Sequence, residues 1–212
     1  ARRFEEYLEL IKRLWTEESV SHDSETCHLD NVRMNLRPVQ KPYPPIWIAA
    51  NNDRAIERAA RMSDAWMINP HSKIQTIRRH MTLYRDALSA NGKPGPRVLP
   101  VVKELFCAKD RATALEMAGP YLSGKYQDYA KWGQDKAMPE SETFDQDFES
   151  LTADRFILGS PEECYEQLRP YWEEFGVNHL LIRTHWAGMP LSTALHSIRL
   201  ISDELLPTLQ AL

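Results

Sequence analysis

Two histidines follow apolar runs of the chain, and histidine is the side chain that changes charge most readily near neutral pH. His71 comes just after residues 65–69, and His185 comes just after residues 179–184. At such a position an imidazole can act as a general acid or base, or can hydrogen-bond a ligand. A histidine at the end of a strand is also often a structural group held by hydrogen bonds, so the sequence leaves both roles open.

An arginine interrupts the last of these apolar runs. Arg183 lies among Leu, Ile and Thr residues, and Trp186 follows three positions later. A buried guanidinium needs an anionic partner, because an unpaired charge is costly to remove from water. The partner is a substrate, a cofactor or an internal carboxylate, and the sequence does not choose among the three.

A short segment, Ala50-Asn51-Asn52, joins another apolar run to the start of a predicted helix. The free backbone N–H groups and the positive dipole end of a helix N-terminus favour an anion such as a phosphate. The alternative is that Asn52 or Asp53 simply caps the helix.

A glycine-started loop carries two further candidates. Gln134 and Lys136 follow Gly133 next to aromatic residues, which suits a lid that closes over a ligand, although an exposed turn is equally consistent. The aromatic residues before the loop are more typical of core packing than of a base-stacking platform: they are Tyr121, Tyr126, Tyr129 and Trp132.

Four short apolar runs, each followed by a helical pattern, must position these side chains. We expect strands at 46–50, 65–69, 98–108 and 179–184. Strands that alternate with helices predict an α/β fold with a parallel sheet. An amphipathic helix is expected at about 3–16, followed by a polar stretch with a small strand or hairpin.

Two α/β architectures compete for this pattern. A doubly wound nucleotide fold should have a glycine-rich loop after its first strand, and none of the eight glycines stands in such a motif. A (β/α)₈ barrel remains, of which the chain supplies only four of the eight strands. Ligands of such a barrel bind at the carboxyl ends of the strands, where the candidate residues above lie.

Residues 109–158 interrupt the alternation of strands and helices, and we interpret them as an insertion or lid.

The composition of the 212 residues argues against several classes of protein. Lys and Arg total 26 against 30 Asp and Glu, so the formal net charge of −4 predicts no nucleic-acid partner. No run approaches the ~20 apolar residues that span a bilayer, so we expect no membrane partner. Three widely spaced cysteines without a CxxC motif predict reduced thiols and no metal site. A cytoplasmic protein is the resulting expectation.

Several segments together resemble the bacterial luciferase-like family of flavin-dependent monooxygenases and oxidoreductases. The most specific is P-V-Q-K-P-Y-P-P-I-W-I at 38–48, with supporting similarity in 3–16, in 58–66 and in G-S-P-E-E at 159–163. The resemblance covers most of the chain except the insertion.

The resemblance implies a (β/α)₈ TIM barrel that holds FMN, or a deazaflavin coenzyme in some relatives, at the carboxyl ends of its strands. Residues 1–212 would then be the C-terminal half of a single barrel domain, roughly strands five to eight, and would not catalyse the reaction alone. Family members often have a small polar turn such as Gly-Gly-Ser-Ser where this chain has Ala49-Ala50-Asn51-Asn52.

On this resemblance the intact protein is expected to be a monooxygenase that uses reduced FMN and dioxygen on a small organic substrate. It would form a homodimer and work with a flavin reductase. A deazaflavin-dependent dehydrogenase and a non-catalytic assembly subunit are the alternatives, while a metal-dependent hydrolase lacks the ligand cluster that it needs. The expected roles are catalysis by His185, His71 and Arg183, cofactor binding by Ala50, Asn51, Asn52 and Trp186, and closure over the substrate by Gln134 and Lys136.

Overall fold

The computed structural model describes residues 1–139 and 142–211. These residues form two compact units, 1–46 and 47–212, of which the second contains every candidate site residue. None of the helices described in either unit has the length and apolar character needed to cross a membrane.

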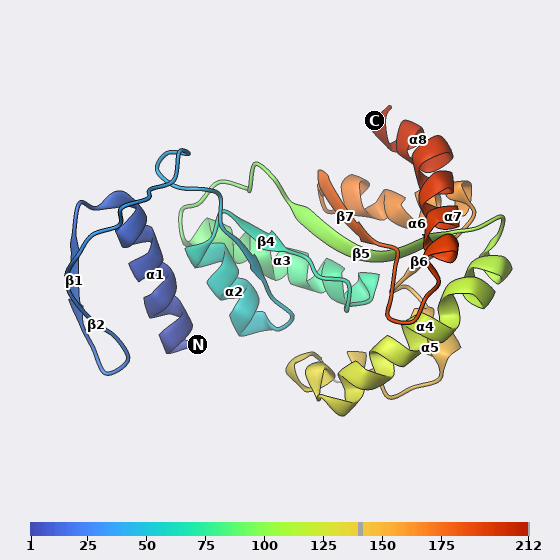
Figure 1. Cartoon of the computed structure of the whole chain (residues 1–212), viewed down its shortest axis with the longest axis horizontal. Coiled ribbons are helices and arrows are strands. Elements are labelled where there is room, and N and C mark those ends of the chain that lie inside the picture. Colours follow the sequence, from blue (N-terminus) through green and yellow to red (C-terminus); the bar gives the residue numbers. More distant parts are fainter. Residues whose placement is uncertain (140–141, 212) are drawn as a thin grey trace. The chain divides into compact units, whose positions relative to one another are not determined.

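The first unit consists of a helix and a hairpin (Figure 1). Helix α1 (Arg2–Thr16) confirms the predicted amphipathic helix, and strands β1 (Val20–Asp23) and β2 (His28–Val32) pair antiparallel. The side chain of Glu6 on α1 accepts a hydrogen bond from Thr26 Oγ1 in the hairpin turn at 2.5 Å. A charge-assisted contact of this kind fixes the helix against the hairpin.

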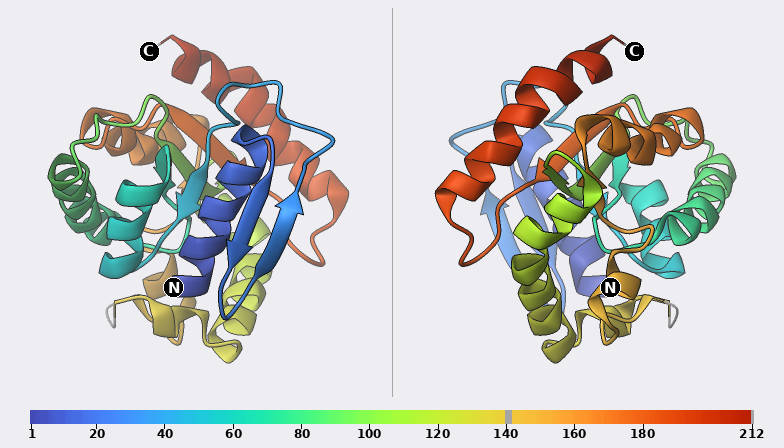
Figure 2. Two further views of the ribbon diagram at one scale, coloured as in Figure 1. Left: turned by 90° about the vertical axis from the view of Figure 1, so that its left-hand side faces the viewer. Right: turned by 90° about the vertical axis from the view of Figure 1, so that its right-hand side faces the viewer.

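The second unit begins with two short parallel strands and two helices. Strands β3 (Trp47–Ala49) and β4 (Ala65–Met67) pair in register, and each is followed by a helix, α2 (Asp53–Met62) or α3 (Ile74–Ala90). Figures 1 and 2 show α2 and α3 side by side. Their inward faces bury apolar and aromatic side chains with β4, as the periodicity predicts: these include Ile56, Ala59, Trp66, Ile77 and Tyr84.

A longer strand, β5 (Pro100–Cys107), lies at the centre of the rest of the sheet. It pairs in parallel with β7 (His179–Arg183) on one side and with the short β6 (Ile157–Gly159) on the other. A parallel bridge between Ile68 and Val101 joins β4 to β5. The four predicted strands are therefore confirmed in the order β3-β4-β5-β7, whereas β6 was not predicted. The strands described do not close into a barrel.

The predicted insertion is mostly ordered secondary structure. Helix α4 (Arg111–Lys131) is capped by Asp110, whose side chain accepts the N–H of Thr113, and it runs through the aromatic segment. The short helices η1 (Gln134–Ala137) and α5 (Phe148–Thr152) follow. Tyr126 is fully buried in the core and Tyr121 and Tyr129 pack against it partly buried, so the expected core packing of these aromatic residues stabilises the helix.

The C-terminal part of the chain is helical apart from β7. Helix α6 (Pro161–Glu173) starts with a capping box formed by Ser160 and Glu163. Helix α7 (Leu191–Leu200), the π-helical turn η3 (Ile201–Leu205) and α8 (Leu206–Gln210) form the continuous red rod in Figure 2.

A fully buried ion pair anchors the insertion to the sheet. Arg155 Nη2 lies 2.7 Å from Glu142 Oε2, and neither side chain is exposed. The other carboxylate oxygen of Glu142 accepts the backbone N–H of Lys73, just before α3. Because Lys73 follows the end of β4, this pair holds the insertion beside the carboxyl ends of the strands.

Replacing Arg155 with alanine should therefore destabilise the protein strongly. The change leaves the Glu142 carboxylate buried without its partner, which typically costs about 3–5 kcal/mol of unfolding free energy. Arg169→Ala is the control, because Arg169 pairs with Glu166 on the surface and such pairs contribute less than ~1 kcal/mol. Chemical denaturation of the intact protein measures both. Equal losses of unfolding free energy in the two variants would contradict the role of Arg155 in anchoring the insertion.

Candidate functional site

The candidate site is built around a carboxylate buried in the middle of the sheet. Glu104 lies on β5 and its side chain has no exposed surface. Successive side chains of a strand point to opposite faces. The neighbouring Lys103 accordingly packs with its Nζ 5.2 Å from the ring centre of Tyr171 on α6, whereas Glu104 contacts α4 and the end of β7.

Three side chains bind the two oxygens of Glu104. Lys125 of α4 forms an ion pair with Oε1, and Arg183 Nη1 lies 3.2 Å from the same oxygen. Trp186 Nε1 donates to Oε2 at 2.7 Å. The internal carboxylate is thus the partner of Arg183, one of the three alternatives that the sequence allowed. Burial lowers the pKa of Lys125, and the nearby Glu104 opposes that shift.

The register of the sheet explains why these residues meet. Glu104 and Arg183 are paired positions of β5 and β7, so adjacent parallel strands place them side by side. Trp186 lies just beyond the end of β7, and Lys125 projects from the helix that covers this part of the sheet.

A pocket of about 440 Å³ opens beside this cluster. It lies between the second half of α4 and the residues after β7, and it contains three predicted site residues, Arg183, His185 and Trp186. The lining consists of Pro120, Tyr121, Gly124, Lys125, Asp128, Tyr129, Trp132, Arg183, His185, Trp186 and Ala187.

The hydrogen bond of His185 defines which ring nitrogen is free. His185 Nε2 lies 3.0 Å from the backbone carbonyl oxygen of Met189. Because a carbonyl oxygen only accepts, Nε2 carries the hydrogen, and in the neutral ring Nδ1 is the nitrogen that can accept a proton. His185 is exposed and lines the pocket, so its ring can meet a ligand there.

His71 is held in a ring cluster next to the pocket. Its ring centre lies 5.5–6.0 Å from those of Tyr126, Tyr129 and Phe144, and Nδ1 is 3.4 Å from the Tyr126 hydroxyl. Burial, followed by the positive charge of Lys125, lowers the pKa of His71 to about 4. The imidazole is therefore neutral at pH 7, and its ring contacts Tyr129, which lines the pocket.

The segment after β3 is engaged in hydrogen bonds within the protein. Asn52 Oδ1 accepts the N–H of Ala55 at 3.1 Å and so caps α2, while Asn52 Nδ2 donates to the Ala137 carbonyl of η1 at 3.2 Å. Asn51 hydrogen-bonds Asn69 at the end of β4, and Ala50 accepts from the Trp66 indole. The cap is confirmed, and phosphate binding by Ala50, Asn51 and Asn52 stays a prediction.

The expected lid residues lie on η1. Gln134 and Lys136 are both exposed, and the Asn52 side chain holds the end of this helix through Ala137. Asp135, between the two, accepts the N–H of Phe144 at 3.1 Å. Closure of this segment over a substrate stays a prediction.

The predicted residues therefore fall into two groups. The pocket brings together Arg183, His185 and Trp186, with His71 beside them. The second group joins the α2 start to η1 through the hydrogen bond of Asn52, and none of its members lines this pocket.

Two residues of the site were not predicted: Glu104, which is buried beside the pocket, and Lys125, which lines it. Glu104 interrupts the apolar run 98–108 as Arg183 interrupts 179–184, so the same signal could have identified it. Lys125 lay in a segment that was interpreted as part of an insertion.

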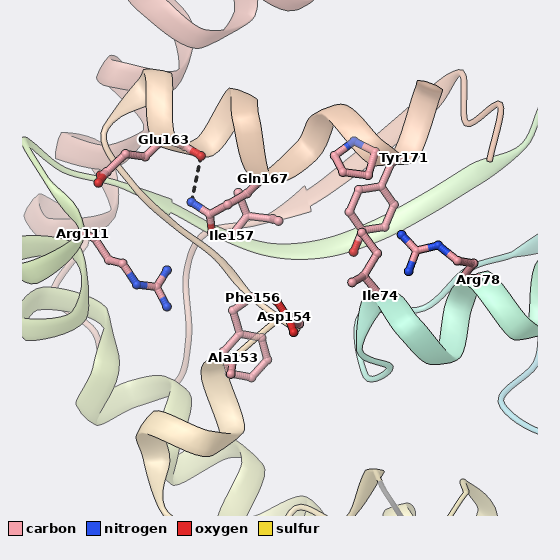
Figure 3. Close-up of a pocket in the computed structure, with 11 residues that line it drawn as sticks. Ile74, Arg78, Arg111, Ala153, Asp154, Phe156, Ile157, Glu163, Gln167 and Tyr171 are labelled. Carbon is pink, nitrogen blue, oxygen red and sulfur yellow. Dashed lines mark hydrogen bonds between the residues drawn. The ribbon is translucent and has the colours of Figure 1, made fainter. Parts of the chain in front are cut away.

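A second, larger cavity of about 680 Å³ lies between α3, α6 and residues 153–157 (Figure 3). Its charged side chains mainly form contacts that stabilise the fold. Arg78 binds Glu174 with two nitrogens, at 2.7 and 2.9 Å, and Glu163 completes the capping box of α6. The dashed contact in Figure 3 is the bond from Gln167 to the Glu163 backbone. This cavity contains no predicted site residue.

No group of three or more His, Cys, Asp or Glu side chains suited to a metal ion occurs in residues 1–139 and 142–211. The three cysteines are free thiols. Cys107 on β5 and Cys164 on α6 are buried with their sulfur atoms 3.5 Å apart.

Comparison with known proteins identifies similar chains. The sequence model described as luciferase-like monooxygenase matches residues 1–179. The phthiodiolone/phenolphthiodiolone dimycocerosates ketoreductase of Mycobacterium kansasii is 25% identical over 209 residues, which cover 85% of this chain and 56% of the relative.

Three known structures share the fold. Monooxygenase RslO1 from Streptomyces bottropensis has a TM-score of 0.75 and 25% identity, covering 98% of this chain and 61% of that one. The oxygenating constituent of 3,6-diketocamphane monooxygenase from Pseudomonas putida, in complex with FMN, has a TM-score of 0.71 and 19% identity over 95% and 62% of the two chains. An F420-dependent secondary alcohol dehydrogenase has a TM-score of 0.66 and 13% identity over 84% and 54%. The chain thus spans less than two thirds of each of these proteins, and its fold is part of the luciferase-like TIM barrel.

The lowered pKa of His71 predicts a pH dependence of stability. Between pH 6.5 and about 4 the unfolded chain binds more protons at this histidine than the folded one, so the unfolding free energy falls as the pH drops through this window. His71→Gln should remove part of that fall, whereas His28→Gln, at an exposed histidine of the hairpin, should not. Urea denaturation of the unchanged protein and both variants at pH 7.0, 5.5 and 4.5 measures the unfolding free energy at each pH. An NMR titration that gives His71 a pKa near 6.5 would refute the burial argument.

Proposed function

Since the chain belongs to the luciferase-like monooxygenase family, we propose that it is part of a flavin-dependent oxidoreductase. The reaction that we favour is oxygenation of a small organic substrate with reduced FMN and dioxygen. The family match supports an oxidoreductase, and the FMN in the 3,6-diketocamphane monooxygenase supports the choice of cofactor.

One observation carries the proposal to this chain's own residues. The cluster of Glu104 with Lys125, Arg183 and Trp186 places cations and aromatic rings in a pocket beside the end of β7. The carboxyl ends of the strands are where barrels of this type bind ligands. A buried carboxylate that orients two cations there is typical of a prepared binding site rather than of a surface ion pair.

The residues after β3 and β4 fit the phosphate of a flavin. Helix α2 begins just after this segment, and the first N–H groups of a helix lack partners in a preceding turn. The side chain of Asn52 already binds the N–H of Ala55 and the Ala137 carbonyl, so its amide would exchange the bond to Ala137 for one to the phosphate. The negative charge of Asp53 at this helix start is balanced by Arg79, which binds both its oxygens at 2.7 and 3.0 Å. The donors around Ala50 are therefore suited to an anion.

The roles of the chain follow from these positions. Ala50, Asn51 and Asn52 would hold the phosphate, and Trp186 would limit the access of water from the side of the pocket. His185 Nδ1 can accept a proton from a substrate in the pocket. A bound flavin supplies the redox chemistry itself. Gln134 and Lys136 would cover the phosphate side, since Asn52 links η1 to that segment.

A deazaflavin-dependent reductase or dehydrogenase is the second candidate. The ketoreductase relative aligns with 85% of this chain, and the alcohol dehydrogenase that shares the fold depends on F420. His185 and a neutral His71 near the strand ends suit proton transfer to or from a carbonyl or hydroxyl group, which such a reaction needs. The two candidates differ in the coenzyme and in their need for dioxygen.

The partners follow from the favoured reaction. An enzyme that consumes reduced FMN needs a flavin reductase, and we propose one as the partner of this protein. We also propose that it is a cytoplasmic homodimer.

Flavin titration of the intact protein tests the proposal. FMN fluorescence should be quenched in a saturable way, and Asn51→Ala should weaken binding about tenfold through loss of an amide next to the phosphate. Asn35→Ala, an exposed residue of the first unit, is the matched control. Saturation with F420 alone would favour the second candidate. Absence of saturable quenching with either coenzyme would contradict both and leave a non-catalytic subunit.

A further inference from the structure

We propose that the pocket beside Glu104 binds a small aromatic carboxylate as the substrate. This inference deepens the proposed function by naming a substrate class, and it rests on that function. It is carried by the charge balance of the pocket, by the donors left on Arg183 and by the rings that line the walls.

The charged groups that line the pocket, taken with their ion-pair partners, leave one positive charge uncompensated. Glu104 contributes one negative charge, whereas Lys125 and Arg183 contribute two positive charges. Asp128 also lines the pocket, but it is paired with Lys131 at 3.1 Å. Partly buried charges are screened less than surface charges, so the surplus favours an anionic ligand.

Arg183 keeps donors that a carboxylate can use. Its Nη1 donates to Glu104 at 3.2 Å, and the side chain remains 42% exposed where it lines the pocket. A guanidinium carries five N–H groups in a planar fork that matches the two oxygens of a carboxylate. Arg183 can therefore bind a ligand carboxylate while Glu104 still holds it in place.

Four tyrosine and tryptophan side chains line the pocket. Trp186 contributes little of this surface, because it is only 3% exposed and its one polar side-chain atom is bound to Glu104. Tyr129 and Trp132 pack together with ring centres 5.8 Å apart, and Trp132 is 69% exposed despite its size. Tyr121 completes the set. Rings grouped in this way favour a planar aromatic ligand over an aliphatic one.

The volume of about 440 Å³ suits a ligand of this size, because pockets for small molecules start at about 300 Å³. FMN also joins an aromatic ring to an anion. The test must therefore separate a substrate from the cofactor.

Binding of four probes to the intact protein tests the inference. Isothermal titration or ligand-observed NMR compares benzoate with benzamide, which lacks the charge, and with cyclohexanecarboxylate, which lacks the aromatic face. FMN is added as a competitor. We expect benzoate to bind at least fivefold more tightly than either analogue, and to bind equally well when FMN is saturating.

Variants assign the binding to the named residues. Arg183→Gln should weaken benzoate at least tenfold and leave the weak binding of benzamide unchanged, whereas Arg183→Lys should keep part of the affinity. Trp132→Ala should weaken benzoate more than cyclohexanecarboxylate. Arg199→Gln, an exposed arginine of α7, is the matched control. Lys125→Gln gives a second charge variant if Arg183→Gln fails to fold.

Each remaining outcome overturns the inference. It falls if no probe binds, if benzamide binds as well as benzoate, or if Arg183→Gln and Arg199→Gln behave alike. Displacement of benzoate by FMN would assign the pocket to the cofactor. Flavin binding is measured separately. FMN binding without benzoate binding would therefore refute the proposed substrate class but not the proposed flavin-dependent function.

Discussion

The burial of the Glu104 carboxylate is the constraint on which the site depends. A carboxylate inside a sheet is stable only when its oxygens are fully hydrogen-bonded and its charge is balanced. Lys125, Arg183 and Trp186 meet both needs, and they come from α4, from β7 and from the segment after β7. One buried charge therefore fixes three separate parts of the chain at the wall of one pocket.

A second buried carboxylate, that of Glu142, fixes the insertion in the same way. The Glu142–Arg155 pair holds residues of the insertion against the start of α3, and Phe144 packs on His71 within the same region. These contacts bring the aromatic half of α4 next to the strand ends. Residues 120–132 of the insertion thus form one wall of the pocket, and η1, which follows them, is attached through Asn52.

The local elements were predictable because their signals are local. The apolar runs at 46–50, 65–69 and 179–184 correspond directly to β3, β4 and β7. The partner of Arg183 was not predictable, since Glu104 is 79 residues away and only the pairing of β5 with β7 brings them together. The continuation of α4 through Tyr126 was missed for a similar reason, because core packing across the insertion stabilises it. Both histidines were found as candidates from the sequence. The lowered pKa of His71 depends on its burial, and the free ring nitrogen of His185 depends on the bond to the Met189 carbonyl, and neither could be read from the sequence.

A double-mutant cycle between Glu104 and Trp186 tests the central claim most directly. Glu104→Leu, Trp186→Phe and the double variant are compared with the unchanged protein by chemical denaturation, so that the cost of leaving Lys125 and Arg183 unpaired cancels. A hydrogen bond to a buried carboxylate predicts a coupling free energy of about 1.5–3 kcal/mol. A coupling indistinguishable from zero would mean that Glu104 does not hold Trp186 at the pocket and would contradict the account.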